Sequence, residues 1–252
     1  MITIKNQDGI RKMREACGIV AMVHEELRKL IAPGISLIEL DRSAEKLIRQ
    51  SGAVPSFKGY GGFPGTLCIS VDEAVIHGIP DRRKLVQGEI VSIDAGAFYL
   101  GYHGDAAFTA AVGSVSAEKA RLIQVTEDSF YKGIAMAKAG NRLSDISHSI
   151  EQVVTEAGFS VVREFVGHGI GRDLHEDPAI PNYGPPGRGP LLEPGMTLAI
   201  EPMVNMGGPS VEILEDGWTV VTMDKLPSAH YEHTILITED GPEILTKVQS
   251  HD

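Results

Sequence analysis

Residues 90–113, which read IVSIDAGAFYLGYHGDAAFTAAVG, decide the fold. Two apolar, strand-like runs at residues 90–95 and 106–112 are joined by a turn that contains Gly101 and Gly104. Apolar runs of this length around a glycine-containing turn predict an antiparallel β-hairpin. The remainder of the chain can be organised around this hairpin.

Two acids belong to the predicted hairpin. Asp94 closes the first run and Asp105 opens the second, so a hairpin folded near Leu100 brings them opposite or diagonal to each other. Cross-strand neighbours on one face lie roughly 4.5–5.5 Å apart at Cβ. Two carboxylates that close, with apolar neighbours, repel each other and lose solvation unless a cation lies between them. A divalent cation is the simplest candidate, and two acids at the ends of a solvated hairpin are the alternative.

Composition limits the class of protein. The chain has 252 residues, of which 42% are hydrophobic and 23% charged, as in ordinary globular proteins. A net charge of −11 without a basic cluster argues against nucleic acid as a partner. The N-terminus lacks the apolar core of a signal peptide, and no run of apolar residues is long enough for a membrane span. With Cys17 and Cys68 as the two cysteines, a disulfide framework is excluded, so we expect a cytoplasmic protein that does not bind membranes.

Four amphipathic helices are predicted from apolar residues at helical spacing. The first begins at Asp8 as N-cap and runs to about residue 30, and the second begins with a capping box formed by Ser36 and Glu39 and ends at Gly52. The third and fourth cover about residues 116–138 and 143–157.

The second pair of helices repeats the first. A constant offset sets Gly34 on Gly140 and Gly52 on Gly158. In the strands that follow, a closely similar offset sets GEIVSID on GMTLAIE, and HGDAAFTAAV resembles HYEHTILIT. These matches pair Asp94 with Glu201 and Asp105 with Glu232. Internal repetition of this kind fixes architecture.

We therefore predict a single α+β domain over residues 1–252. Its two pseudo-symmetric halves, about 1–113 and 114–252, share one curved antiparallel sheet with the helices on its outer face. The four acids are expected where the halves join.

A histidine joins these acids in the predicted site. His168 lies among three glycines in EFVGHGIGRDLHED, residues 164–177, which leave its imidazole unobstructed. A lone histidine is more often a packed or surface residue, but this one accompanies four carboxylates. Oxygen donors with one imidazole suit Mn²⁺, Fe²⁺, Co²⁺ or Zn²⁺, and the charge of the four carboxylates is matched by two such ions. A dinuclear hydrolytic centre follows, in which Glu201 can take and return a proton.

Two further groups have two interpretations each. His77 and His175 lie beside turn residues, where they either stabilise a tetrahedral intermediate by hydrogen bonding or are solvated loop histidines. Trp218, with Tyr60 and Phe63 in GYGGFPG, either walls a small apolar pocket or belongs to the core.

At these motifs the chain resembles the bacterial type I methionine aminopeptidases, which have the pita-bread fold. The resemblance runs end to end, through VIHGIP, SIDAG, GYHGDAAFT, VGHGIGRDLHEDP, LAIEPM and HYEHTILIT. It implies removal of the initiator methionine from nascent chains and peptides when the next residue is small, by a monomer with the ribosome as a candidate partner. The ligands of the two metal ions it implies are Asp94, Asp105, His168, Glu201 and Glu232.

The resemblance also assigns roles to the remaining residues. His77 and His175 match positions that contact the scissile peptide, and the methionine pocket matches Tyr60, Phe63, Cys68 and Trp218. Two pocket positions depart from the family pattern: Phe57 stands where a smaller residue is usual and Leu174 where phenylalanine is usual, a swap compatible with conserved pocket volume. Backbone positions that hold Na⁺ or K⁺ in relatives match Asp72, Ala74 and Ser228.

Two alternatives remain. Xaa-Pro aminopeptidases and prolidases use the same ligand set but usually carry a further N-terminal domain, whereas the first helix here is expected near Asp8. Non-catalytic binding proteins of this fold have lost ligands, whereas all five positions here hold competent ones. The short spacing between Glu201 and Glu232 also leaves no room for the helical insertion of type II enzymes.

Overall fold

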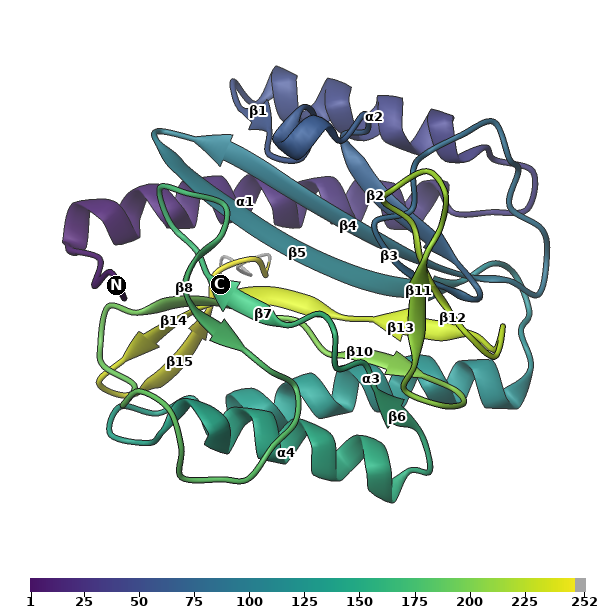
Figure 1. Ribbon diagram of the computed structural model, residues 1–252. Helices are drawn as coiled ribbons and strands as arrows, with labels where there is room; N and C mark the ends of the chain where they lie inside the picture. Colours follow the sequence, from purple (N-terminus) through teal and green to yellow (C-terminus); the bar gives the residue numbers. More distant parts are fainter. Residues whose placement is uncertain (248–252) are drawn as a thin grey trace.

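A computed structural model describes residues 1–247 of the chain (Figure 1). The helices are α1 (Gln7–Leu30), α2 (Leu37–Gln50), η1 (Tyr60–Gly62), α3 (Ala117–Ile134) and α4 (Leu143–Glu156). The strands of the first half are β1 (Val54–Pro55), β2 (Leu67–Val71), β3 (Ala74–Ile76), β4 (Ile90–Tyr99) and β5 (Tyr102–Ala111). Those of the second half are β6 (Ser160–Val161), β7 (Gly167–Gly169), β8 (Glu176–Ile180), β9 (Thr197–Ile200), β10 (Met203–Asn205), β11 (Val211–Ile213), β12 (Val220–Thr222), β13 (Ser228–His230), β14 (Glu232–Thr238) and β15 (Gly241–Ile244).

One large antiparallel sheet organises the molecule, which confirms the predicted α+β fold. Its strand order is β1-β4-β5-β14-β9-β7-β8, with β2 also on β4 and β15 on β14. Helices α1 and α2 lie along the half built on β4 and β5, and α3 and α4 lie along the other half (Figure 1). None of the helices within residues 1–247 combines the length and the apolar composition that a bilayer crossing requires.

The predicted hairpin is β4 and β5. Asp94 faces Ala107 and Asp105 faces Gly96 across the strands, so the two acids are diagonal neighbours. The turn consists of Leu100 and Gly101, both with positive φ, as a two-residue hairpin turn with the right twist requires.

Gly104 does not belong to this turn, contrary to prediction. It lies inside β5, and a Cβ there would be 2.8 Å from the Cα of Cys17 in α1. The glycine is therefore needed because the helix backbone crosses the strand at this point. The strands are accordingly longer than the apolar runs alone indicate.

Helix ends agree with prediction except at two places. The N-cap of α1 is Asn6, whose Oδ1 accepts from the backbone N–H of Gly9 at 2.9 Å, whereas Asp8 lies in the first turn. The capping box of Ser36 and Glu39 is confirmed. Helix α3 ends at Ile134 rather than near residue 138, because the chain tightens into a turn in which the N–H of Met136 bonds to the carbonyl of residue 133.

The seam between the halves is the contact of β5 with β14. Their ladder has two pairs, Glu232 with Ala107 and His233 with Ala106. A threonine hydroxyl continues the seam on each side. The hydroxyl of Thr234 accepts from Asp105 N–H at 3.1 Å and donates to its carbonyl at 2.8 Å, and Thr109 bonds in the same two ways to the backbone of residue 230. Side chains thus replace part of the backbone ladder where the predicted acids lie.

Candidate active site

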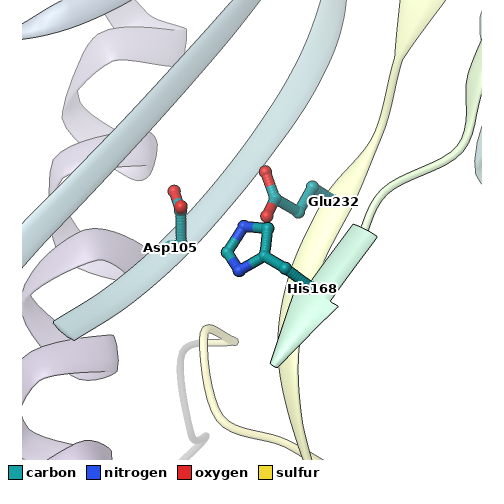
Figure 2. A group of neighbouring side chains, drawn as sticks. All are labelled: Asp105, His168 and Glu232. Carbon is teal, nitrogen blue, oxygen red and sulfur yellow. The ribbon is translucent and has the colours of Figure 1, made fainter. Parts of the chain in front are cut away.

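Five strands bring the predicted donors together at the seam. Asp94 comes from β4, Asp105 from β5 and His168 from β7. Glu201 directly follows β9, and Glu232 opens β14. Figure 2 shows the imidazole of His168 beside the carboxylate of Glu232, with Asp105 facing them from the neighbouring strand. The repeat predicted from sequence therefore places acids of both halves in one cluster.

The donor atoms of the cluster lie within reach of a shared ion. One atom each from Asp105, His168 and Glu232 lie within 4.8 Å of one another. His168 Nε2 lies 3.6 Å from Glu201 Oε1, which is too far for a hydrogen bond. Within residues 1–247, three buried carboxylate oxygens of the cluster have no hydrogen-bond partner: Asp94 Oδ1, Asp105 Oδ1 and Glu232 Oε1. Since buried polar atoms are normally partnered, these oxygens suit the binding of a cation.

The electrostatics of the cluster point the same way. Burial raises the pKa of Asp94 to about 7. Burial, together with repulsion from the neighbouring carboxylates, raises the pKa values of Asp105, Glu201 and Glu232 well above their usual range. Burial also lowers the pKa of His168 to about 4, so that its imidazole is neutral, as metal ligation requires. The donor set fits divalent metal ions, whose charge would remove the repulsion.

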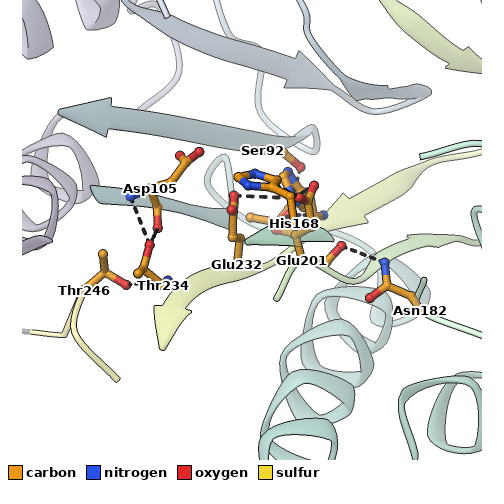
Figure 3. Close-up of polar contacts among 10 residues, drawn as sticks. Ser92, Asp105, His168, Asn182, Glu201, Glu232, Thr234 and Thr246 are labelled. Carbon is orange, nitrogen blue, oxygen red and sulfur yellow. Dashed lines mark hydrogen bonds and ion pairs between the residues drawn. The ribbon is translucent and has the colours of Figure 1, made fainter. Parts of the chain in front are cut away.

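Neighbouring residues hold these candidate donors in place (Figure 3). Asn182 Nδ2 donates to the backbone carbonyl of Glu201 at 2.9 Å. The Thr234 hydroxyl holds the backbone of Asp105, and the N–H of Thr234 donates to Thr246 Oγ1 at 3.2 Å. Hydrogen bonds around the ligands fix their orientation and tune a metal site. Sequence reasoning assigned no role to these supports, because each acts on a backbone group far away along the chain.

A cavity of about 150 Å³ opens onto the cluster. A cavity of that size holds a group about as large as benzene, comparable to one side chain. Its lining contains the five donors and all eight of the other predicted residues, Phe57, Tyr60, Phe63, Cys68, His77, Leu174, His175 and Trp218. The structure therefore brings these thirteen predicted residues to one place, whereas Asp72, Ala74 and Ser228, predicted as positions for a monovalent cation, do not line the cavity.

The apolar side of this cavity is closely packed. Phe57, Phe63, Cys68 and Leu174 are buried, and the rings of Phe63 and Trp218 meet edge to face at 5.2 Å between centroids. The two positions that depart from the family pattern, Phe57 and Leu174, belong to one hydrophobic cluster.

The polar side of the cavity carries two histidines. His175 Nδ1 lies 2.7 Å from the hydroxyl of Tyr60, and its ring lies 4.3 Å from that of His168. His77 has φ +58°, a strained backbone conformation for a side chain of this size, and burial lowers its pKa to about 4. Strain of this kind is concentrated at functional sites.

One residue beside the cluster was not assigned a role from sequence. His230 in β13 is 2% exposed, and its Nε2 lies 3.8 Å from Glu201 Oε2 and 3.9 Å from Glu232 Oε2. The available signal was its position two residues before Glu232, since residues two apart on an extended chain face the same side.

Comparisons with known proteins agree with this geometry. Metallopeptidase family M24 matches residues 11–239. Methionine aminopeptidase 1 of Bacillus subtilis is 58% identical over 248 residues, which cover 98% of this chain and all of that protein. The crystal structure of methionine aminopeptidase from Thermotoga maritima is 49% identical, covers 98% of this chain and 100% of that one, and superposes with a TM-score of 0.97.

A more distant neighbour addresses the alternative peptidases. Prolidase from Pyrococcus furiosus is 25% identical with a TM-score of 0.80, and the match covers 98% of this chain but 66% of the prolidase. The fold is thus shared with prolidases, whereas end-to-end similarity at high identity is to methionine aminopeptidases. This chain belongs to metallopeptidase family M24 and, within it, to the methionine aminopeptidases.

Proposed function

We propose that this chain removes the N-terminal methionine from peptides and nascent proteins by metal-dependent hydrolysis. The observation that carries the proposal is a single cavity in which five metal donors on one side meet an apolar pocket on the other. Because the donors lie next to the pocket, a substrate side chain bound in the pocket places the adjacent peptide bond at the donors. An exopeptidase, which cleaves the first peptide bond of its substrate, requires this arrangement. Family membership supports the same reaction.

The residues proposed to hold two divalent ions are Asp94, Asp105, His168, Glu201 and Glu232. Bound ions of this kind polarise a scissile carbonyl and activate water for attack on it. We assign to Glu201 the transfer of a proton from the attacking water to the leaving amine.

His77 and His175 are proposed to contact the scissile peptide. The contact between His175 Nδ1 and the Tyr60 hydroxyl leaves Nε2 of His175 as the ring nitrogen available for substrate. Hydrogen bonds from such fixed groups stabilise the charge that develops on the carbonyl oxygen in the transition state.

The methionine side chain is proposed to occupy the apolar pocket formed by Phe63, Cys68, Trp218 and the two unusual residues. A Cβ on Gly96 would lie 2.8 Å from Cε1 of Phe57, so the absence of a side chain at Gly96 makes room for that ring. We infer that Leu174, smaller than the usual phenylalanine, compensates for the volume that Phe57 adds.

The finer assignments belong to the same proposal. The two divalent ions are Co²⁺, Mn²⁺, Fe²⁺ or Zn²⁺. A Na⁺ or K⁺ ion is held near Asp72, Ala74 and Ser228. The enzyme acts as a cytoplasmic monomer with one catalytic domain, it prefers a small second residue, and the ribosome is its candidate partner.

The test is release of free amino acid from two peptides, Met-Gly-Met-Met and Ala-Pro-Gly-Met. Metal-stripped protein is titrated separately with Mn²⁺, Co²⁺, Fe²⁺ and Zn²⁺, and Glu201→Gln is the control variant. We expect metal-dependent release of methionine from the first peptide, lost in the variant. Cleavage of the second peptide alone would instead assign a proline-specific peptidase, and cleavage of neither would leave a binding role.

A further inference from the structure

His103 connects two walls of the apolar pocket. The first wall is the segment of residues 56–63, which carries Phe57 and Phe63 and belongs to the first half of the chain. The second wall is the turn of residues 171–175, which carries Leu174 and belongs to the second half. His103 lies on β5 and forms a hydrogen bond with each wall.

The side chain of His103 holds the first wall. Its Nδ1 lies 2.9 Å from the Oγ of Ser56, the residue next to Phe57. Ser56 is buried, and its N–H donates to the carbonyl of Gly96 at 3.0 Å. A Cβ on Gly96 would lie 2.8 Å both from Cβ of Ser56 and from Cε1 of Phe57. The first wall therefore packs directly against β4, and the imidazole of His103 fixes the hydroxyl of that contact.

The backbone of His103 holds the second wall. Its N–H donates to the carbonyl of Gly171 at 2.8 Å, and the N–H of Gly171 donates to the carbonyl of Asp173 at 3.1 Å. These bonds begin the turn that brings Leu174 and His175 to the cavity. Both pocket residues that depart from the family pattern, Phe57 and Leu174, thus lie on segments bonded to His103.

The two walls also meet at the rim of the cavity, where the Tyr60 hydroxyl lies 2.7 Å from His175 Nδ1. Tyr60 is 47% exposed, so water competes for this contact. The contact of Ser56 with His103 is partly buried, and a hydrogen bond shielded from water is electrostatically stronger. Of the two contacts, the one at His103 therefore fixes the position of the first wall more firmly.

His103 is not among the described residues that line the cavity. It lies two positions before Asp105 on β5, so the two side chains face the same side of the strand. An effect of the imidazole on a bound side chain therefore passes through Ser56 and Phe57.

We propose that His103 is a positioning residue that sets the spacing between Phe57 and Leu174 and thereby the selectivity of the pocket for methionine. The inference rests on the proposed function for the identity of the bound side chain. The methionine side chain is unbranched and adapts to a narrow space between two fixed walls, whereas the branched leucine side chain requires a wider one. Loosening the first wall should therefore weaken the discrimination between the two.

The first experiment compares hydrolysis of Met-Gly-Met-Met and Leu-Gly-Met-Met by the Mn²⁺-loaded protein. His103→Leu should raise KM for the first peptide about five- to tenfold, leave kcat within about twofold and reduce the preference for methionine. His103→Asn should retain most of the original values, because its amide can still bond to the Ser56 hydroxyl. A fall in kcat with KM unchanged, or equal effects of the two variants, would overturn the assignment.

His148 supplies a matched control. It is also half-buried, and its Nδ1 lies 3.2 Å from the carbonyl of Gly184, but it belongs to α4 in the outer layer of the second half. His148→Leu removes the same kind of contact away from the pocket. We expect it to leave KM and the preference for methionine unchanged.

Trp218, the only tryptophan of the chain, reports on the first wall without catalysis. Its ring centroid lies 5.2 Å from that of Phe63, and a Cβ on Gly61 would lie 3.2 Å from its ring. The first wall therefore packs against Trp218. In metal-free protein, quenching of its fluorescence by acrylamide should rise about twofold in His103→Leu and in Ser56→Ala, and stay unchanged in His148→Leu.

Equal quenching in the unaltered protein, His103→Leu and Ser56→Ala would overturn the assignment. Ser56→Ala removes the same hydrogen bond from its other end, so the test stands even where His103→Leu does not fold. Failure of the unaltered protein to cleave either peptide would count against the proposed function, and the quenching of Trp218 would still decide the role of His103.

Discussion

The buried ion pair of Lys5 and Glu176 is expected to hold the turn that carries two pocket residues. Lys5 Nζ lies 2.5 Å from Glu176 Oε2, and the side chains are 3% and 11% exposed. Glu176 Oε1 also accepts the backbone N–H of Arg172 at 2.8 Å, which fixes the turn leading to Leu174 and His175. The N-terminal segment thus reaches the proposed active site through one carboxylate.

The absence of a side chain at Gly171 makes this pairing possible. A Cβ there would lie 2.4 Å from Glu176 Oε1 and 2.5 Å from Lys5 Cε. Substituting Lys5→Met keeps most of the apolar stem but leaves the carboxylate buried without a counter-charge. Breaking a buried pair in this way costs about 3–5 kcal/mol of unfolding free energy. Replacing both partners, in Lys5→Met with Glu176→Gln, removes both charges while the amide oxygen still accepts from Arg172, so we expect most of the loss to be recovered.

Urea unfolding at pH 7.5, followed by circular dichroism, measures these differences. The control is Arg14→Met, which breaks an ion pair with Glu243 of similar length, 2.7 Å, whose arginine side chain is 43% exposed. An exposed pair contributes about 0–1 kcal/mol. The reasoning is refuted if Lys5→Met costs no more than Arg14→Met, or if the double variant is less stable than Lys5→Met alone.

Three further outcomes follow from other parts of the structure. Thr234→Val removes both hydrogen bonds to the Asp105 backbone and should cost about 2–4 kcal/mol in urea unfolding, whereas Thr234→Ser, which keeps the hydroxyl, should cost clearly less. Asp105→Asn should abolish peptide hydrolysis and leave the metal-free fold intact by circular dichroism, because one of the repelling charges is gone; global unfolding would contradict the metal-site interpretation. Burial lowers the pKa of His24 well below 6.5, so the unfolded state binds the extra proton and stability falls as the pH drops through 6.5. His24→Leu should therefore lose about 1.4 kcal/mol less than the unaltered protein between pH 7.5 and 5.5, and equal losses would refute this cause.

The elements predicted correctly are those whose signals are local. The capping box of Ser36 and Glu39 begins α2, and the apolar runs around Gly101 form the hairpin. The internal repeat extended the prediction to the site, because aligning Asp94 with Glu201 and Asp105 with Glu232 in sequence requires no knowledge of their distances in space. Each half carries its two acids at equivalent positions, so the four acids meet where the halves join.

The features missed depend on contacts between distant segments. Gly104 reads as a turn residue until α1 is placed across it at Cys17. His230 reads as part of a strand until its ring is found facing Glu201. Lys5 and Glu176 are ordinary charged residues in sequence, and nothing within either segment marks them as a buried pair. The roles assigned through family resemblance, such as that of Leu174 in the pocket, stay predictions until the peptide assay is done.

The position of the proposed metal donors also bears on how the two halves are held together, in addition to the pairing of β3 with β12. Asp94 and Asp105 come from the first half, whereas His168, Glu201 and Glu232 come from the second. Between them the sheet has two ladder pairs and two threonine hydroxyls, and the buried carboxylates repel across this short seam. Ions bound there would turn that repulsion into attraction and cross-link the halves. Anything that binds the folded state alone stabilises it. Metal ions bound here would therefore also contribute to the free energy of folding, and the proposed ligands would serve the architecture as well as the chemistry.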